Sequence, residues 1–438
     1  MVNRKILGLV IVIAIGVTGL SIGIYYIMTL DSEGPEVTEE LPSLFQAKWN
    51  QTWGGSYSEN VYAMYLDSMD DIHLIGTTDS PTKRCFLKYN SSGILQSYNL
   101  SSGKIDTVAR EGLNSYITEE ETVLTPFGPK YSTDLYKYNN SGGILWSITD
   151  LKEGRAISDS FGNVYLSVPS NYKVIMVKFN SSGDLQWNIT WNSADQIVSS
   201  QKITDSMGNF YLAGEIDVGS GFFNIFLTKF NSSGDLQWEE TWGGSNVDYL
   251  YQIGIDSLDN IYLSGMTFGV NDLYLVKYNS EGTWQWDYIW SAADINDELT
   301  AIHFDSSNNI YLTGRRGAPS SCNVTLIKVN DQGTYQWMRS WGGSDREEPA
   351  LLVSDSGNNI YVTGRTTSFG AGGYDIFLIK YNTTGDFQGE YIWGGNVTET
   401  LRMIALDSFE NIYLTGITNS FGVGGYDIFL IKLTQNIT

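Results

Sequence analysis

One type of segment recurs along almost the whole chain and decides what the chain can fold into. Its turn signature, Asp-Ser-x-x-Asn or a close variant, begins at Asp67, Asp159, Asp205, Asp256, Asp305, Asp355 and Asp407. These starts are 92, 46, 51, 49, 50 and 52 residues apart. Because the first interval is twice 46, we expect a degenerate copy inside it. Residues 105–150 fit, since they lack the Asp-Ser turn but keep DLYKYNNSGGILW in register. The chain therefore contains eight units.

Each unit is predicted to form four β-strands. The four runs are exemplified by residues 401–406, 412–415, 427–432 and 236–242. Such runs are too short for helices and are rich in Ile, Val, Tyr, Phe and Thr, which suit a pleated surface. The connections at 355–358 and 231–234 carry the Asp, Asn and Gly that tight hairpins need. A unit is therefore a small antiparallel sheet.

A sheet of about 50 residues cannot bury both of its faces alone, so the units must stack on one another, and radial stacking gives an all-β β-propeller. The chain enters with a lone fourth strand in QAKWNQTWGG (46–55) and ends with a third strand (427–433) that has no fourth. Pairing of Ala47–Trp53 with Phe429–Leu433 would close the ring and remove its open edges. We predict eight four-stranded blades in residues 44–438, with seven as the alternative, and a monomer.

The N-terminal segment is expected to anchor the chain in the plasma membrane. Residues 6–30 carry no charge, and as a helix at about 1.5 Å per residue they span a hydrocarbon core of roughly 30 Å. Arg4 and Lys5 precede them and five acidic residues follow in 31–43. The positive-inside rule then places residues 1–5 in the cytoplasm and the propeller outside, beyond an acidic linker at 31–43. The alternative is a signal peptide cleaved near Gly19 and Ser21, which would give a secreted protein.

Charge and residue usage exclude several function classes. A net charge of −23 repels phosphate backbones, so nucleic acid is not an expected partner. The only histidines, His73 and His303, lie in strand-like runs, so no His-based metal or acid–base site is expected. Cys85 and Cys322 fall in different repeats, and a disulfide between them is not favoured. No cofactor is expected.

The repeat resembles the SBBP-type β-propeller repeat of bacterial and archaeal surface and secreted proteins. The resemblance is carried by WGGSxxD at 242–248, DSxxNIYLTG at 407–416 and DIFLIK at 427–432, with the KYN form at 375–382. It covers about residues 45–438 and implies a propeller scaffold without a common enzymatic activity or cofactor. The second copy departs from the pattern, as do 168–172, 193–195 and 291–294.

Two repeated motifs have a structural explanation that competes with a functional one. The Asp-Ser-x-x-Asn turns lack the full set of oxygen ligands and the final Glu of a calcium loop, so we interpret them as turns. Asn-x-Ser/Thr motifs suit glycosylation outside the cell, although many also belong to Asn-Ser-Ser-Gly turns. The glycosylation candidates are Asn50, Asn90, Asn99, Asn139, Asn180, Asn188, Asn231, Asn323, Asn382, Asn396 and Asn436.

The repeated aromatic residues are expected to pack in the core or between blades rather than to form a sugar-binding surface. They are Trp187, Trp238, Trp286, Trp337, Tyr211, Tyr262, Tyr311, Tyr361 and Tyr413.

An acidic residue follows the fourth-strand Trp by six positions in four units. These residues are Glu59, Asp248, Glu347 and Glu399, with Asp195 and Asp294 nearby in two others. Fourth-to-first and second-to-third connections share one face of a propeller, so the carboxylates could ring the mouth of the channel. There they would attract a cation, a basic partner or sugar hydroxyls. The alternative is that each bonds backbone amides and ties neighbouring blades together.

Arginines at the same face would partly neutralise that ring. Arg315, Arg316 and Arg365 are the candidates. The favoured hypothesis is a membrane-anchored, extracellular, non-catalytic binding or cell-surface interaction scaffold, whose partner is an extracellular protein or a glycan. The alternatives are an extracellular enzyme that acts on polysaccharide through carboxylates at the channel mouth, and a structural component of a surface layer.

Overall fold

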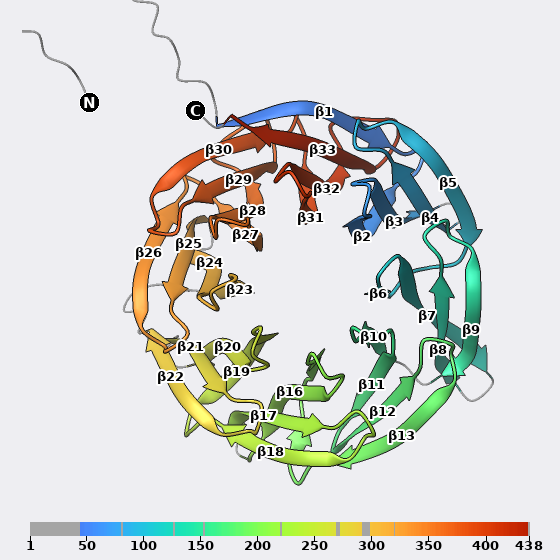
Figure 1. Cartoon of the computed structure of the whole chain (residues 1–438), viewed down its shortest axis with the longest axis vertical. Coiled ribbons are helices and arrows are strands. Elements are labelled where there is room, and N and C mark those ends of the chain that lie inside the picture. Colours follow the sequence, from blue (N-terminus) through green and yellow to red (C-terminus); the bar gives the residue numbers. More distant parts are fainter. Residues whose placement is uncertain are drawn as a thin grey trace, which may run out of the picture. The chain divides into compact units, whose positions relative to one another are not determined.

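The computed structural model describes residues 44–436, apart from 80–81, 126–127, 152–153, 220, 269–271, 291–297 and 319. The described residues form 33 strands in eight antiparallel sheets. The sheets stand as blades around a common axis, with the first strand of each blade innermost and the fourth at the rim (Figure 1). The prediction of an eight-bladed propeller is confirmed, and the seven-bladed alternative is wrong.

The first four blades follow one another along the chain. They comprise β2 (Glu59–Leu66), β3 (Ile72–Asp79), β4 (Thr82–Tyr89) and β5 (Leu95–Ser102); β6 (Thr107–Glu111), β7 (Asn114–Thr125), β8 (Gly128–Tyr138) and β9 (Ile144–Leu151); β10 (Arg155–Ser158), β11 (Val164–Ser170), β12 (Lys173–Phe179) and β13 (Leu185–Asn192); and β14 (Gln196–Ile197), β15 (Gln201–Thr204), β16 (Phe210–Asp217), β17 (Phe223–Phe230) and β18 (Leu236–Trp242). The degenerate second copy is therefore a complete blade.

The other four blades complete the ring. They comprise β19 (Val247–Ile255), β20 (Ile261–Phe268), β21 (Asp272–Tyr278) and β22 (Trp284–Trp290); β23 (Glu298–Phe304), β24 (Ile310–Ala318), β25 (Ser321–Val329) and β26 (Tyr335–Trp341); β27 (Glu347–Ser354), β28 (Ile360–Thr366), β29 (Asp375–Tyr381) and β30 (Phe387–Trp393); and β31 (Glu399–Leu406), β32 (Ile412–Thr418) and β33 (Asp427–Gln435) with β1 (Phe45–Trp53).

The two ends of the propeller close the ring by strand pairing. β1 runs antiparallel to β33, with Ala47 opposite Leu433 and Thr52 opposite Phe429. The N-terminal strand is thus the fourth strand of blade 8, as the sequence predicted (Figure 1). No helix among the described residues is long and apolar enough to cross a membrane. The predicted anchor (6–30) and linker (31–43) lie outside the described residues.

Blade 4 departs from four continuous strands. Its innermost strand is interrupted, and both pieces, β14 and β15, pair with β16. At the interruption the Val198 amide donates to the Glu215 carbonyl at 2.8 Å, and the Ser199 hydroxyl donates to the Glu215 carboxylate at 2.5 Å. Val198 and Ser199, which lie between the two pieces, are therefore bound by the backbone and the side chain of Glu215 in β16.

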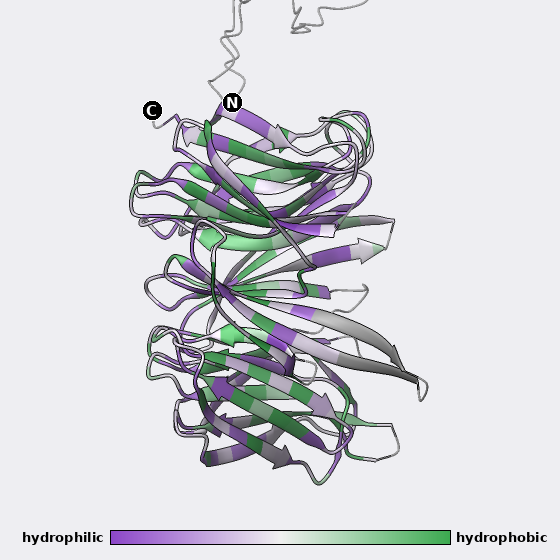
Figure 2. Cartoon of the chain, turned by 90° about the vertical axis from the view of Figure 1, so that its right-hand side faces the viewer, coloured by the Kyte–Doolittle hydropathy of each residue, from purple (hydrophilic) through white to green (hydrophobic). Residues whose placement is uncertain are grey.

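The core lies between neighbouring blades. Second and third strands are buried on both faces, and every residue of β29 is buried, whereas the rim strand β30 is largely exposed. Seen edge-on, hydrophobic and hydrophilic residues alternate along many strands (Figure 2). The strand runs that the sequence shows as near-continuous apolar stretches are therefore the middle strands of the blades, as burial on both faces requires.

A repeated contact joins each blade to the next, and blade 4 shows it in full. Lys229 of β17 donates from Nζ to the carbonyl of Ser280, in the turn between the third and fourth strands of blade 5, at 2.9 Å. Trp238 of β18 donates from Nε1 to the same oxygen at 3.3 Å. Lys229 Nζ also lies 3.6 Å from Asp205 and 5.0 Å from the ring centre of Tyr211. We call this Lys and Trp pair, together with the carbonyl it binds, the blade joint.

Six blade joints of this form occur among the described residues. Their Lys, Trp and acceptor carbonyl are Lys137, Trp146 and Ser181; Lys178, Trp187 and Ser232; Lys229, Trp238 and Ser280; Lys277, Trp286 and Asp331; Lys328, Trp337 and Thr383; and Lys432, Trp49 and Ser91. The last one uses Trp49 of β1, so the closing strand makes the same contact as the fourth strands of the other five blades in this set. The repeated Trp residues pack between blades, as predicted.

The remaining two junctions replace the joint with other groups. Between blades 1 and 2, Asn99 donates from Nδ2 to the carbonyls of Ser141 and Gly142, both at 3.2 Å. Between blades 7 and 8 no hairpin turn is available as acceptor, because the third strand of blade 8, β33, pairs with the N-terminal strand β1 as its fourth. There Lys380 donates to Oε1 of Gln435 at 2.6 Å, and Gly389 stands where six of the blades carry Trp, so that Leu44 packs against it.

The Asp of the repeated turn binds the amides of its own turn, as the turn interpretation predicts, and also contacts the third-strand Lys. In blade 7, Asp355 Oδ1 accepts the amides of Gly357 at 3.0 Å and Asn359 at 2.8 Å. Its Oδ2 accepts the Tyr361 hydroxyl at 2.9 Å and lies 3.2 Å from Lys380 Nζ. Although burial raises the pKa of Asp355, these hydrogen bonds and Lys380 leave it below its ordinary value. In blade 2, which lacks the Asp, Glu111 pairs with Lys137 and Tyr116 instead.

Gly282→Ala tests the blade joint. Gly282 has a φ of +81°, and a Cβ there would lie 2.6 Å from the Trp238 ring. We expect the variant to lower the free energy of unfolding by about 1–3 kcal/mol, because the backbone is strained and the indole is displaced. Urea unfolding followed by tryptophan fluorescence measures it. Gly244→Ala is the control, since a Cβ there meets nothing within 4 Å. Equal effects of the two changes would contradict the joint.

Candidate functional site

The acidic residues predicted at the mouth of the ring lie buried between blades. Glu399 and Glu347 are each 0% exposed. Glu399 accepts the Thr418 hydroxyl at 2.8 Å and the Gly395 amide at 2.9 Å. Glu347 accepts the equivalent groups of Thr366 at 3.0 Å and Gly343 at 3.3 Å. Each carboxylate thus ties the loop that enters its blade to the second strand of that blade.

The other two acidic candidates occupy the same position in their blades. Asp248 accepts the Thr267 hydroxyl at 2.7 Å, and Glu59 accepts the Gly55 amide at 3.4 Å. Both are buried. These contacts correspond to the structural alternative, in which each carboxylate bonds backbone and ties blades together, and they leave little of the carboxylates open to a ligand. Asp294 lies outside the described residues.

A second carboxylate faces two of these four across a glycine. A Cβ on Gly394 would lie 1.6 Å from Asp375 Oδ1 and 2.5 Å from Glu399 Oε2, so only glycine fits there. Gly54 is confined in the same way by Asp427 and Glu59. Burial, together with the nearby charges of Asp427 and Asp79, raises the pKa of Glu59 to about 7, although the Gly55 amide opposes the shift. Burial also raises the pKa of Asp375 and of Asp427.

The structure brings the arginine candidates Arg315 and Arg365 together around Glu348. Arg365 Nη2 lies 2.5 Å from Glu348 Oε2, and Arg315 Nη1 lies 3.6 Å from Glu348 Oε1. Arg346 adds a third guanidinium at 2.6 Å, and Glu298 pairs with Arg315. We call these five residues the arginine cluster. They come from blades 6 and 7, at the starts of the inner strands β23 and β27, the ends of β24 and β28, and the loop before β27.

The arginine cluster carries surplus positive charge at a partly open surface. Three arginines face two glutamates, in a chain whose net charge is −23. The side chains of Arg346 and Arg365 are each 33% exposed, and that of Arg315 is 24% exposed. Arg346 Nε is buried and lacks a hydrogen-bond partner among the described residues. A guanidinium with unused donors suits a carboxylate or another planar anion.

Sequence reasoning found two members of this cluster and missed Arg346, Glu298 and Glu348. The signal was present, because the Asp-Arg-Glu-Glu that follows Trp-Gly-Gly-Ser in 341–348 has no counterpart in the other repeats. Arg316, the third arginine candidate, points away from the cluster. Its Nη1 lies 3.8 Å from the sulfur of Met338 in its own blade.

The glycosylation candidates divide into three groups. Asn90, Asn139, Asn180, Asn231 and Asn382 lie in turns between third and fourth strands, where the side-chain oxygen accepts backbone amides. Asn99 is engaged at the junction of blades 1 and 2, and Asn323 and Asn436 are partly buried. The remaining candidates, Asn50, Asn188 and Asn396, are exposed, as Asn99 also is.

The two histidines contact side chains within or between blades, and the two cysteines are buried. His73 is buried and lies 3.0 Å from Asp67. It takes the place of the Tyr that binds this Asp in other blades. His303 lies 2.9 Å from the Ser354 hydroxyl of the next blade, and burial lowers the pKa of its ring. Cys85 and Cys322 are both buried and unbridged.

Several solved structures are similar to this chain at low sequence identity. No family model matches the chain, and no curated protein matches it. The crystal structure of BamB from Moraxella catarrhalis is similar, with 11% identity over 89% of this chain and 98% of that one and a TM-score of 0.48. The β-propeller domain of the Trilobed protease from Pyrococcus furiosus has 11% identity over 77% and 96%, with a TM-score of 0.46. Polysaccharide lyase Uly1 has 10% identity over 77% and 91%, with a TM-score of 0.45. We draw no activity or ligand from these similarities.

Glu59 gives a testable pH dependence. Its pKa is about 7 in the folded protein against an ordinary value of 4.5, so the folded state holds a proton that the unfolded chain releases in this range. The contribution of Glu59 to stability is therefore full below about pH 4.5 and is lost as the pH rises through 7. We expect Glu59→Gln to remove this part of the decline, measured as the difference between the two urea-unfolding curves at each pH. Glu240→Gln, at an exposed position of β18, controls for charge alone. An unchanged decline in Glu59→Gln would contradict the assignment.

Proposed function

We propose that this chain is a membrane-tethered, extracellular β-propeller that serves as a non-catalytic binding scaffold. The charge-free segment 6–30, the lysine and arginine before it and the acidic stretch after it support the tether and its orientation. The resemblance to the SBBP-type repeat supports a surface location. Native protein should be recovered in the membrane fraction with residues 1–30 intact, and an N-terminus at or after Ile22 would show instead that the segment is cleaved.

The contacts made by the acidic residues support a binding role rather than a catalytic one. An enzyme that acts on glycosidic bonds needs two carboxylates at the substrate, one of them as a proton donor. The four acidic candidates at the mouth are instead buried and bonded to threonine hydroxyls or backbone amides of the blade interfaces. Moving any of them toward a substrate would leave those groups without acceptors.

The arginine cluster is the observation that carries the proposal. Arg346 and Arg365 present partly exposed side chains beside the inner strands of blades 6 and 7, and the cluster retains one positive charge beyond its glutamates. The chain's overall negative charge weakens the binding of long polyanions, so a short acidic ligand that places one carboxylate at the cluster is the best fit. We infer that the partner is a surface glycan that presents a uronic acid carboxylate.

Titration of the full chain in mild detergent with a short galacturonate oligosaccharide tests this role. We expect saturable binding that weakens about tenfold or more in Arg365→Gln, since charged hydrogen bonds to a carboxylate are lost. Maltotriose is the neutral ligand control. Arg402→Gln, exposed on β31 outside the cluster, is the matched variant and should bind as the wild type does.

Three results would contradict the proposal. Equal binding of maltotriose and galacturonate, or equal affinity in Arg365→Gln, would remove the arginine cluster as the site. Shortening of the galacturonate chain during incubation, seen as new products on a chromatogram, would favour the alternative of an enzyme that acts on polysaccharide.

A further inference from the structure

Blade 6 lacks an aromatic ring that four other blades place against the preceding blade. In blades 4, 5, 7 and 8 a third-strand ring pairs with the last Trp of the blade before, at centroid distances of 4.4–5.0 Å. The pairs are Trp191–Phe226, Trp242–Tyr274, Trp341–Phe377 and Trp393–Phe429. Each ring residue stands opposite a second-strand glycine, as Phe377 does opposite Gly364. In blade 6 the residue opposite the corresponding Gly314 is Thr325.

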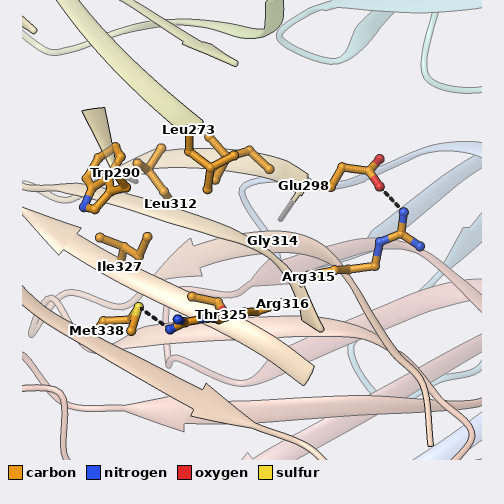
Figure 3. Close-up of a pocket in the computed structure, with 11 residues that line it drawn as sticks. Leu273, Trp290, Glu298, Leu312, Gly314, Arg315, Arg316, Thr325, Ile327 and Met338 are labelled. Carbon is orange, nitrogen blue, oxygen red and sulfur yellow. Dashed lines mark hydrogen bonds and ion pairs between the residues drawn. The ribbon is translucent and has the colours of Figure 1, made fainter. Parts of the chain in front are cut away.

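A cavity of about 160 Å³ lies where that ring would be. Leu273 and Trp290 of blade 5 line it on one side, and Leu312, Ile327 and Met338 of blade 6 line it on the other (Figure 3). The ion pair of Arg315 and Glu298 lies at its opposite end from Trp290. A cavity of roughly 150 Å³ with apolar walls holds a molecule the size of benzene. The missing side chain has thus left room for one aromatic ring.

Two buried polar atoms at the cavity have no partner among the described residues. They are Nε1 of Trp290 and Oγ1 of Thr325, and Thr325 is only 7% exposed. Buried donors of this kind are nearly always satisfied in folded proteins. A bound molecule with an acceptor would satisfy the Thr325 hydroxyl, whereas a hydrocarbon would not.

A guanidinium also lines this cavity at a position where other blades carry threonine. In blades 5, 7 and 8 the second residue after the conserved glycine is Thr267, Thr366 or Thr418, each of which bonds a buried carboxylate. In blade 6 it is Arg316, which lies beside Thr325 (Figure 3). Its guanidinium donates to the weakly accepting sulfur of Met338 at 3.8 Å and keeps further donors for an anion.

We propose that this cavity binds a small aromatic carboxylate. The ring takes the place of the missing third-strand aromatic side chain and packs on Trp290, and the carboxylate accepts hydrogen bonds from Arg316 and Thr325. The cavity borders the arginine cluster at Arg315 and Glu298, but the residues proposed to bind the ring and the carboxylate, Trp290, Arg316 and Thr325, are not members of that cluster. A chain that binds no galacturonate could still bind here, and the reverse also holds.

Benzoate is the probe, with the full chain in mild detergent and with thermal unfolding and tryptophan fluorescence as readouts. We expect benzoate to raise the unfolding temperature and to change the fluorescence of Trp290, and benzamide, its uncharged analogue, to bind about tenfold more weakly. Arg316→Thr, which restores the residue of the other blades, should reduce the preference for benzoate over benzamide to near equality.

Thr325→Phe is the decisive variant, because it supplies the ring that the other blades have. It should unfold at a higher temperature than the wild type and no longer respond to benzoate. The proposal is overturned if benzoate up to millimolar concentrations leaves the unfolding temperature and the fluorescence of the wild type unchanged. A stabilised Thr325→Phe would then show that the cavity is only a packing defect. It is also overturned if Thr325→Phe binds benzoate as the wild type does, or if Arg316→Thr still prefers benzoate to benzamide. The comparison of benzoate with benzamide in Arg316→Thr tests the proposal even if Thr325→Phe fails to fold.

Discussion

A lysine ammonium buried at each blade joint is the interaction on which the rest of this structure depends. Removing an ammonium group from water is costly unless its donors and its charge are satisfied. Here the turn Asp supplies the charge, the Tyr ring supplies a π face, and the following blade supplies a carbonyl oxygen. Because the last of these acceptors belongs to another repeat, a blade completes its own polar network only when its neighbour is in place.

This dependence explains why the ring closes as it does. Each blade contacts mainly its neighbours, as in other repeat proteins, so an open stack would leave one lysine and one tryptophan without their carbonyl acceptor. The N-terminal strand solves this at blade 8, since Trp49 and Lys432 bind Ser91 of blade 1. At the junction of blades 7 and 8, the side chain of Gln435 accepts the hydrogen bond from Lys380 that a turn carbonyl accepts at the blade joints. The departures from the repeat at Gly389 and Gln435 are therefore consequences of closure.

Much of the fold could be predicted from the sequence, because the same pattern of strands and turns recurs in eight units. Strand order, turn chemistry and the closure of residues 47–53 on 429–433 follow from the spacing and from the two incomplete ends. The direction of individual side chains could not be predicted in this way. Glu347 and Glu348 are adjacent in sequence, yet one is sealed between blades and the other gathers three arginines, because neighbouring residues of a strand face opposite sides.

The candidate sites were harder to predict because they arise where repeats differ. Arg315 and Arg365 are 50 positions apart and meet only because blades 6 and 7 are neighbours. Thr325 looks unremarkable in isolation, and its meaning appears only when it is aligned with Phe226, Tyr274, Phe377 and Phe429. In a regular scaffold, some residues break the repeat although closure of the propeller does not require it. Those residues are the best indicators of function.

Native-state hydrogen exchange of β1 tests the central claim most directly, namely that the blade joints and the strand closure make the ring one cooperative unit. The account predicts that the slowest amides of residues 47–53 exchange with the same free energy of opening as those of β16 and β17 in blade 4, since releasing β1 breaks the joint of blade 8. If the amides of β1 exchange many-fold faster while blade 4 keeps its full protection, the closing strand is only an attachment, and the joints do not hold the ring together.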